Sequence, residues 1–218
     1  MQNNRTELIF ILDRSGSMAG LESDTIGGYN GMLAQQKQTP GQVRVTTVLF
    51  DDRQELLHDS VDLQQVPPLT SAEYFVRGST ALLDALGSAI GHIAAGQAAL
   101  PKEERAEKVL FVITTDGLEN ASREWTYDKV RALVEEHKAL NGWEFLFLGA
   151  NIDAIGAAQK FGISADRAVN YHADHKGTEL NFKVLGKAIT HVRTKAAPMS
   201  AGWKAEIEED YASRGREF

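Results

Sequence analysis

The chain has 218 residues, of which 43% are hydrophobic and 24% charged, and its formal net charge is −7. This composition is typical of a globular protein, and the length predicts one domain with room for a short appendage. The excess of acid argues against nucleic acid and anionic membrane surfaces as partners, because both attract basic patches. The sequence contains no cysteine, so neither disulfides nor thiolate metal sites can form.

The N-terminal segment MQNNRTE is polar, and the apolar run after it, 8–12, is short. A signal-peptide core or a membrane span needs a longer apolar stretch. We therefore expect a cytoplasmic protein, for which a cysteine-free composition is suitable.

Short apolar runs alternate with longer segments along the chain. The predicted strands are 8–12, 43–50, 55–63, 108–115, 144–150 and 167–171. The second and third runs are separated only by 51–54, which indicates a hairpin. The runs 108–115 and 144–150 are nearly continuous in apolar character, as expected of strands that are covered on both faces.

Apolar residues at three- and four-residue spacing predict four amphipathic helices. Their stripes run from Leu82 to Ile93, from Val130 to Leu140 after a capping Thr126, from Ile152 to Phe161, and from Leu180 to Val192. Strands that alternate with helices indicate an α/β fold. We predict a doubly wound, mainly parallel six-stranded sheet with one antiparallel edge strand and helices on both faces.

Oxygen-bearing side chains follow two of these strands and precede one helix. Asp13, Ser15 and Ser17 come after the first strand in FILDRSGSM. Asp116 follows the fourth strand, and Thr80 immediately precedes a predicted helix. Open parallel sheets bind ligands beyond the carboxyl ends of their strands, where the strand order reverses. If the first and fourth strands are neighbours at the reversal, these side chains share one crevice.

The five side chains form a set of hard oxygen ligands without nitrogen or sulfur. Such a set suits Mg²⁺, Mn²⁺ or Ca²⁺ and is poor for Zn²⁺ or Cu²⁺. Turn formation or helix capping explains each of them taken singly, but the three loops together predict a metal site. Because only two of the ligands are charged, the ion keeps a position open for a carboxylate from another molecule.

On these residues the sequence resembles the von Willebrand factor A domain family, over residues 5–195. DRSGS matches the family's Asp-x-Ser-x-Ser motif, and Thr80 and Asp116 match its second and third metal-loop positions. The resemblance implies a metal-ion-dependent adhesion site in which Ser15, Ser17 and Thr80 contact the ion directly. It implies that Asp13 and Asp116 act through bound water or by orienting the serines. The chain is similar to the small stand-alone bacterial members of the family.

The expected function is divalent-cation-dependent protein binding without catalysis, with an Asp or Glu of the partner completing the metal. One alternative is a metal-assisted hydrolase or phosphoryl-transfer enzyme, and another is a domain whose metal only stiffens its loops. A haloacid-dehalogenase-like phosphatase would need an acid where Ser15 stands. The sequence has neither a phosphate-binding P-loop nor a Gly-x-Ser-x-Gly elbow.

The resemblance also concerns the helix that follows the last strand. In the von Willebrand factor A family this helix can shift, and residues 177–195 correspond to it in this sequence.

The predicted domain covers 1–195, and 196–218 forms a C-terminal tail or a short docked helix. Trp203, Ile207 and Tyr211 recur at four-residue spacing, which is compatible with a helix. Pro198 and Gly202, however, break regular structure and favour a partly ordered tail that packs on its own domain. Its acidic run EIEED is a solvated surface or, alternatively, places Glu206 or Asp210 in the metal site of a neighbouring molecule.

Three further polar groups have two interpretations each. His172, Asp174 and His175 form a solvated loop or a transition-metal site. Glu119 and Asn120 cap the next segment or orient metal-bound water. Asp51 and Asp52 form the hairpin turn and add negative potential near the crevice.

Overall fold

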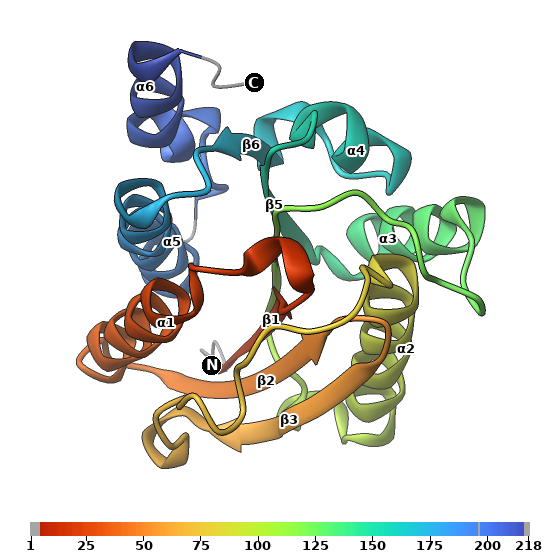
Figure 1. The fold of residues 1–218 in the computed structure, drawn as a ribbon. Helices are drawn as coiled ribbons and strands as arrows, with labels where there is room; N and C mark the ends of the chain where they lie inside the picture. Colours follow the sequence, from red (N-terminus) through yellow and green to blue (C-terminus); the bar gives the residue numbers. More distant parts are fainter. Residues whose placement is uncertain (1–4, 196, 216–218) are drawn as a thin grey trace.

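The computed structural model describes residues 5–195 and 197–215. Its centre is a six-stranded sheet in the order β3-β2-β1-β4-β5-β6 (Figure 1). Edge strand β3 is antiparallel to β2, and every other neighbouring pair is parallel. The strands are β1 (Arg5–Asp13), β2 (Gln42–Phe50), β3 (Gln54–Asp62), β4 (Lys108–Thr115), β5 (Glu144–Ala150) and β6 (Ala168–Tyr171). The predicted α/β class, the antiparallel edge strand and the hairpin are confirmed.

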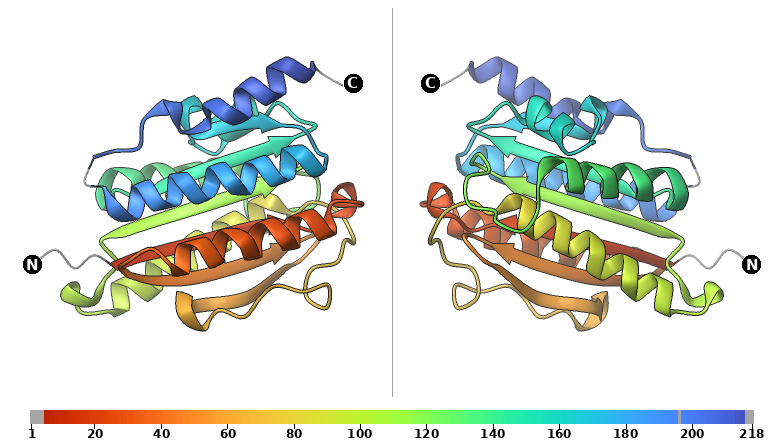
Figure 2. Two further views of the ribbon diagram at one scale, coloured as in Figure 1. Left: turned by 90° about the vertical axis from the view of Figure 1, so that its left-hand side faces the viewer. Right: turned by 90° about the vertical axis from the view of Figure 1, so that its right-hand side faces the viewer.

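Helices cover both faces of the sheet, as Figures 1 and 2 show. One layer contains α1 (Glu22–Lys37) and α5 (His175–Thr194), and the other contains α2 (Leu82–Ala99), α3 (Tyr127–Asn141) and α4 (Ala154–Lys160). Strand β1 explains the two layers. Phe10 belongs to the core under α1 and α5, whereas Ile9 and Ile11 belong to the core under α2 and α3. Successive side chains of a strand point to opposite faces, so an uninterrupted apolar strand needs cover on both.

Helix α1 is not predicted by the hydrophobic pattern. Its buried residues are Thr25, Tyr29, Met32, Leu33 and Gln36, a stripe that is partly polar. Three glycines, Gly27, Gly28 and Gly31, also lower its helix propensity. At Gly28 a Cβ would lie 2.2 Å from the ring of Phe182 in α5. The glycine therefore allows α1 and α5 to pack closely, and this tertiary contact outweighs the weak local signal.

The strand order places the reversal between β1 and β4. From β1 the sheet continues to β2 and β3 on one side, and to β4, β5 and β6 on the other. Leu12 lies opposite Thr114 in the parallel register of β1 and β4. Asp13 at the end of β1 and Asp116 just after β4 therefore emerge at the same edge of the sheet.

The C-terminal segment ends in a docked helix. A 3-10 turn, Ala201–Lys204, leads into α6 (Ala205–Arg214). The ammonium group of Lys204 donates to the backbone oxygens of Ala165 and Ala168 at 2.8 and 2.7 Å. Ile207 joins the core beside α5. The docked-helix interpretation thus describes 205–214, while the boundary at residue 195 stays a prediction.

Among the residues with a described structure, no helix has the length and apolar character needed to cross a membrane.

Candidate metal centre

Asp13 holds the first loop in shape. Its side chain is fully buried at the end of β1. Oδ1 accepts a hydrogen bond of 2.7 Å from the backbone N–H of Ser15, and Oδ2 accepts one of 2.6 Å from the Thr115 hydroxyl. The Tyr74 hydroxyl donates to the backbone oxygen of Asp13. Asp13 therefore ties the loop to the end of β4 and fixes the position of Ser15.

Three hydroxyl groups from two separate loops converge beside Asp13. The Thr80 hydroxyl donates to Ser15 Oγ at 3.1 Å, and Ser15 Oγ lies 3.1 Å from Ser17 Oγ. Ser15 and Thr80 are buried, whereas Ser17 is exposed, so the group opens to solvent on the Ser17 side. The N-cap position of α2 is Ala81, which has no capping group. The Thr80 side chain thus faces the first loop and does not cap the helix.

Asp116 is the fifth predicted site residue, and in the described part of the chain its negative charge is not compensated by a neighbouring base. It is 3% exposed, and neither carboxylate oxygen has a hydrogen-bond partner among the residues that the structure describes. Burial raises the pKa of Asp116 to about 6, the adjacent Ser17 hydroxyl opposes the rise and the charge of Asp13 adds to it. Leaving a buried carboxylate without partners is costly. Two orphaned oxygens beside converging hydroxyls fit a hard divalent cation.

Gly117 keeps the space next to these hydroxyls clear. A Cβ at this position would lie 3.1 Å from Ser17 Oγ and 3.2 Å from Thr80 Oγ1. Contacts this short would displace one of the two hydroxyls. Gly117 and Thr115 therefore both shape the site, although the sequence reasoning misses them. Their signal is weak, because threonine at the end of a strand and glycine after an aspartate are ordinary in turns.

A buried ion cluster supports the first loop from the side of the hairpin. Arg14 is 1% exposed, and its Nε lies 2.8 Å from Asp51 Oδ2, an oxygen that Arg77 Nε also contacts at 2.8 Å. Burial acts to raise the pKa of Asp51, but the hydrogen bonds from Arg77 and Arg14 hold this pKa below its usual value. The turn interpretation of Asp51 is therefore incomplete. Oδ1 accepts from the Arg53 N–H of the turn, while Oδ2 binds two arginines.

The loop after Asp116 caps the second helix. Glu119 Oε2 accepts a 2.8 Å hydrogen bond from the backbone N–H of Leu83 in the first turn of α2. Asn120 Oδ1 accepts from the backbone N–H of Thr80 at 2.9 Å. These contacts fit the capping interpretation of Glu119 and Asn120. They also fix the backbone that presents the Thr80 hydroxyl.

The polar side chains of the segment 172–175 contact other parts of the protein. His175 Nδ1 lies 2.7 Å from Asp24 Oδ1 in α1. Asp174 accepts from the Gly177 N–H and caps α5. His172 Nε2 lies 3.2 Å from the backbone oxygen of Tyr211. In 5–195 and 197–215 no group of three or more His, Cys, Asp or Glu side chains is placed to hold a metal ion.

The acids of the C-terminal helix pair with lysines and an arginine. Glu206 contacts Lys183 and Lys187 of α5, and Asp210 contacts Lys176 and Arg214. The pairs with Lys176, Lys183 and Lys187 fasten α6 to α5, whereas Asp210–Arg214 lies within α6. A tail acid would have to break them before it reached the metal site of a neighbouring molecule.

Comparisons with known proteins place this architecture in a recognised class. Neither a family model nor a curated protein matches the sequence. Solved structures do match the fold, and the chain has a von Willebrand factor A-like α/β fold. The identities are between 14% and 16% in the three structures described next, so the likeness concerns the fold alone.

One similar structure is proximal thread matrix protein 1 from the mussel byssus, at 14% identity and a TM-score of 0.57. The match covers 85% of this chain and 46% of that one, so the chain spans less than half of that protein. Another is a von Willebrand factor type A protein from Catenulispora acidiphila, at 14% identity, a TM-score of 0.54 and coverages of 85% and 42%. A third is the manganese-loaded TRAP protein of Plasmodium vivax, at 16% identity, a TM-score of 0.56 and coverages of 83% and 74%.

Proposed function

We propose that the chain is a divalent-cation-dependent protein-binding module without catalytic activity. Its cation is held by the three hydroxyls of Ser15, Ser17 and Thr80 together with the acids Asp13 and Asp116. An Asp or Glu of the partner protein completes the coordination. The observation that carries this proposal is the pair of buried Asp116 oxygens, which lie next to the hydroxyls and have no hydrogen-bond partner in the part of the chain that the structure describes. A cation compensates this buried charge, and nothing else in the donor set does.

The composition of the site supports Mg²⁺ as the cation, with Mn²⁺ or Ca²⁺ as substitutes. All five side chains offer oxygen only, and hard oxygen ligands suit these ions. The bound cation supplies a positive centre that attracts a carboxylate. Two structural neighbours are described with metal: a second structure of the mussel protein has a zinc-occupied MIDAS motif, and the Plasmodium protein is manganese-loaded.

The rim of the site offers apolar contact to a partner. Leu118 follows Gly117 and is 64% exposed, and Phe75 is 43% exposed. The guanidinium of Arg77 lies 5.2 Å from the centre of the Phe75 ring. Leu118 is next to Gly117 in the chain, and the Arg77 N–H donates to the Arg14 oxygen of the first loop, so apolar surface and one cation adjoin the loops of the site. A partner acid flanked by apolar side chains fits such a rim.

A cytoplasmic location, and the absence of nucleic acid and membrane from the partners, belong to the same proposal. The net charge of −7 and the cysteine-free composition support it.

Metal-dependent capture tests the function. The immobilised chain is exposed to a cell lysate with Mg²⁺ or with chelator, and the bound proteins are compared with those of an Asp116→Ala variant. We expect a partner that binds with Mg²⁺ only, that the variant does not retain, and that loses binding when one of its own Asp or Glu residues is replaced. Glu209→Ala on the exposed surface of α6 is the control and retains the partner. Capture that is unchanged by chelator, or metal-dependent turnover of phosphoesters, contradicts the proposal.

A further inference from the structure

A second polar site lies at the other end of β1. Glu7 is 1% exposed on a strand whose following residues, 8–12, are entirely apolar. It stands near the beginning of β1, whereas the candidate metal centre follows the end of the strand. The candidate metal centre makes no use of this carboxylate. A buried acid inside an apolar strand breaks the local pattern, and such exceptions concentrate at functional sites.

The carboxylate of Glu7 is incompletely satisfied. Oε1 accepts one short hydrogen bond, 2.6 Å from the Ser60 hydroxyl, and a long one, 3.4 Å from Thr46 Oγ1. Oε2 accepts a long bond of 3.4 Å from Gln97 Nε2. A carboxylate has about four acceptor positions, and good bonds to it are shorter than these two long ones. Burial raises the pKa of Glu7 despite the hydrogen bond from Ser60 and the nearby charge of Arg44.

The backbone next to Glu7 is irregular. Ser60 has φ 46°, a left-handed conformation that is uncommon for residues other than glycine. The register of β2 and β3 shifts between Val45 and Thr47 and again between Thr47 and Val48. Bulges of this kind redirect side chains and are frequent next to binding sites. Here the irregular stretch presents the Ser60 hydroxyl to Glu7.

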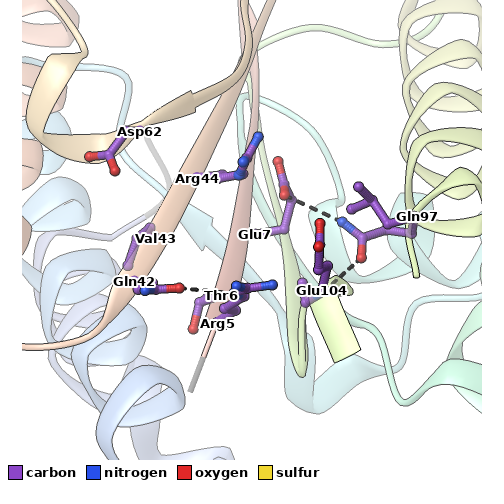
Figure 3. A pocket seen from close by; sticks show the side chains of 11 residues that line it. Arg5, Thr6, Glu7, Gln42, Val43, Arg44, Asp62, Gln97 and Glu104 are labelled. Carbon is purple, nitrogen blue, oxygen red and sulfur yellow. Dashed lines mark hydrogen bonds between the residues drawn. The ribbon is translucent and has the colours of Figure 1, made fainter. Parts of the chain in front are cut away.

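Glu7 also lines a hollow between the sheet and the end of α2. Figure 3 shows the Gln97 side chain reaching the Glu7 carboxylate where both line this hollow, whose volume is about 300 Å³. A second hollow of about 270 Å³ adjoins it, because Glu7, Arg44, Gln97 and Leu100 line both. A space of this size accommodates a small organic molecule.

The charges around the two hollows favour a cation. The acids that line them are Glu7, Asp59, Asp62 and Glu104, against the arginines Arg5 and Arg44 and the histidine His92. Both arginines already donate to neutral oxygens of the protein, and the four acids still outnumber them. Arg5 Nε donates to Gln42 Oε1 at 2.8 Å, and Arg44 Nη1 donates to the backbone oxygen of Ser60 at 3.3 Å. His92 in turn lies 2.7 Å from Asp59. The excess of acid, with Glu7 at the buried end, matches a ligand that carries positive nitrogen.

We propose that this pocket binds a small organic cation, an alkylammonium or a guanidinium compound, whose N–H groups donate to the Glu7 carboxylate. The remaining acids of the rim attract the exposed part of the ligand. The binding is independent of the metal centre, which occupies the opposite end of β1.

Isothermal titration of the full chain tests the proposal, with agmatine and 1,4-diaminobutane as probes. We expect saturable binding of at least one of the two. The matched neutral and anionic compounds, 1,4-butanediol and succinate, produce none. Glu7→Gln keeps the shape of the side chain and removes its charge, and we expect it to weaken binding by about tenfold or more. Glu209→Gln, the same change on the exposed surface of α6, leaves the affinity unchanged.

A second variant decides the matter if Glu7→Gln does not fold. Gly96 lies in α2 and lines the second hollow, and a Cβ there would meet nothing within 4 Å. Gly96→Leu therefore fills the hollow without changing its charge, and we expect it to weaken the probes while the thermal midpoint stays or rises. Asp116→Ala retains amine binding even if the metal proposal fails. Absence of saturable binding by both cations, or equal binding by wild type and both pocket variants, overturns the proposal.

Discussion

The Thr80 hydroxyl donates a 3.1 Å hydrogen bond to Ser15 Oγ, although the two residues are 65 positions apart in the chain. Sheet topology brings them together, because the loop before α2 passes over the loop after β1. Backbone bonds fix the approach: Gly16 N–H donates to the Gly78 oxygen at 3.2 Å, and Arg77 N–H donates to the Arg14 oxygen at 2.9 Å. The loops of the proposed metal site are therefore held in place by contacts within the protein.

Removing the Thr80 hydroxyl tests whether it is a ligand. Thr80→Val preserves the volume of the side chain, and we expect it to weaken Mg²⁺ binding by about tenfold, measured by titration calorimetry. The fold is retained, because the backbone N–H of Thr80 keeps its bond to Asn120. Thr126→Val is the matched control. Its hydroxyl caps α3 by accepting from the Lys129 N–H, so this variant loses about 1 kcal/mol of stability and no metal affinity. Equal metal affinities in the two variants contradict the assignment.

Asp116→Ala separates the metal from the fold. The buried oxygens of Asp116 have no hydrogen-bond partner within 5–195 and 197–215, so their removal breaks no hydrogen bond described for the metal-free protein. We expect its free energy of unfolding in chelator to equal that of the wild type or to exceed it by about 1–2 kcal/mol. Mg²⁺ raises the thermal midpoint of the wild type and leaves that of the variant unchanged. A variant that unfolds more easily in chelator shows instead that Asp116 is a structural residue.

The raised pKa of Asp116 predicts a specific dependence on pH. Its ordinary value is 3.8 and its value in the folded protein is about 6, so between these limits the folded state holds the proton more tightly. The contribution of this group to the stability of the metal-free protein therefore falls as pH rises from about 4 to about 6, and is constant above. The difference in stability between wild type and Asp116→Ala isolates this contribution. A difference that is flat across the window is the contrary result.

In the proposed site, protons and cations compete for the Asp116 carboxylate. In the presence of Mg²⁺, the metal-induced rise in thermal midpoint should decrease as pH falls through about 6, because protonated Asp116 no longer attracts the ion. Thermal melts with and without Mg²⁺ between pH 5 and pH 8 measure this effect. A metal-induced rise that persists undiminished at pH 5 would show that protonation of Asp116 does not weaken cation binding.

Gly117→Ala tests the space beside the hydroxyls. The added methyl group would lie 3.1 Å from Ser17 Oγ, and the hydroxyl must move. We expect metal affinity to fall several-fold with a small change in stability. Gly91→Ala is the control, because its methyl group meets nothing within 4 Å in α2. That variant keeps the metal and gains up to about 1 kcal/mol in stability. Unchanged metal affinity in Gly117→Ala would show that the methyl group is tolerated.

Much of the fold could be predicted from the sequence because the local signals agree with the tertiary structure. The strands at 108–115 and 144–150 are apolar on both faces, and they lie inside the sheet with helices on each side. The four predicted helices have continuous apolar stripes. Helix α1 lacks this agreement, since its packing depends on Gly28 fitting against Phe182. A contact between segments this far apart in the chain leaves no periodic pattern.

The five predicted site residues do converge, because strand ends and helix starts locate them in any parallel sheet. Thr115 and the Arg14–Asp51 pair could not be predicted in the same way. Their roles depend on which atoms meet after folding, and Arg14 in a motif of small residues gives no sign that it is buried. The burial of Glu7 could not be predicted for the same reason, since a single acid near the start of a strand is ordinary at the surface.

Anomalous diffraction from crystals soaked in Mn²⁺ locates the cation of the proposed site. We expect one strong manganese peak within coordination distance of the Ser15, Ser17 and Thr80 hydroxyls, beside the Asp116 carboxylate. The peak should vanish in Asp116→Ala. A saturating soak that leaves these oxygens without anomalous density, or that places the manganese elsewhere, would show that the five residues do not form a cation site.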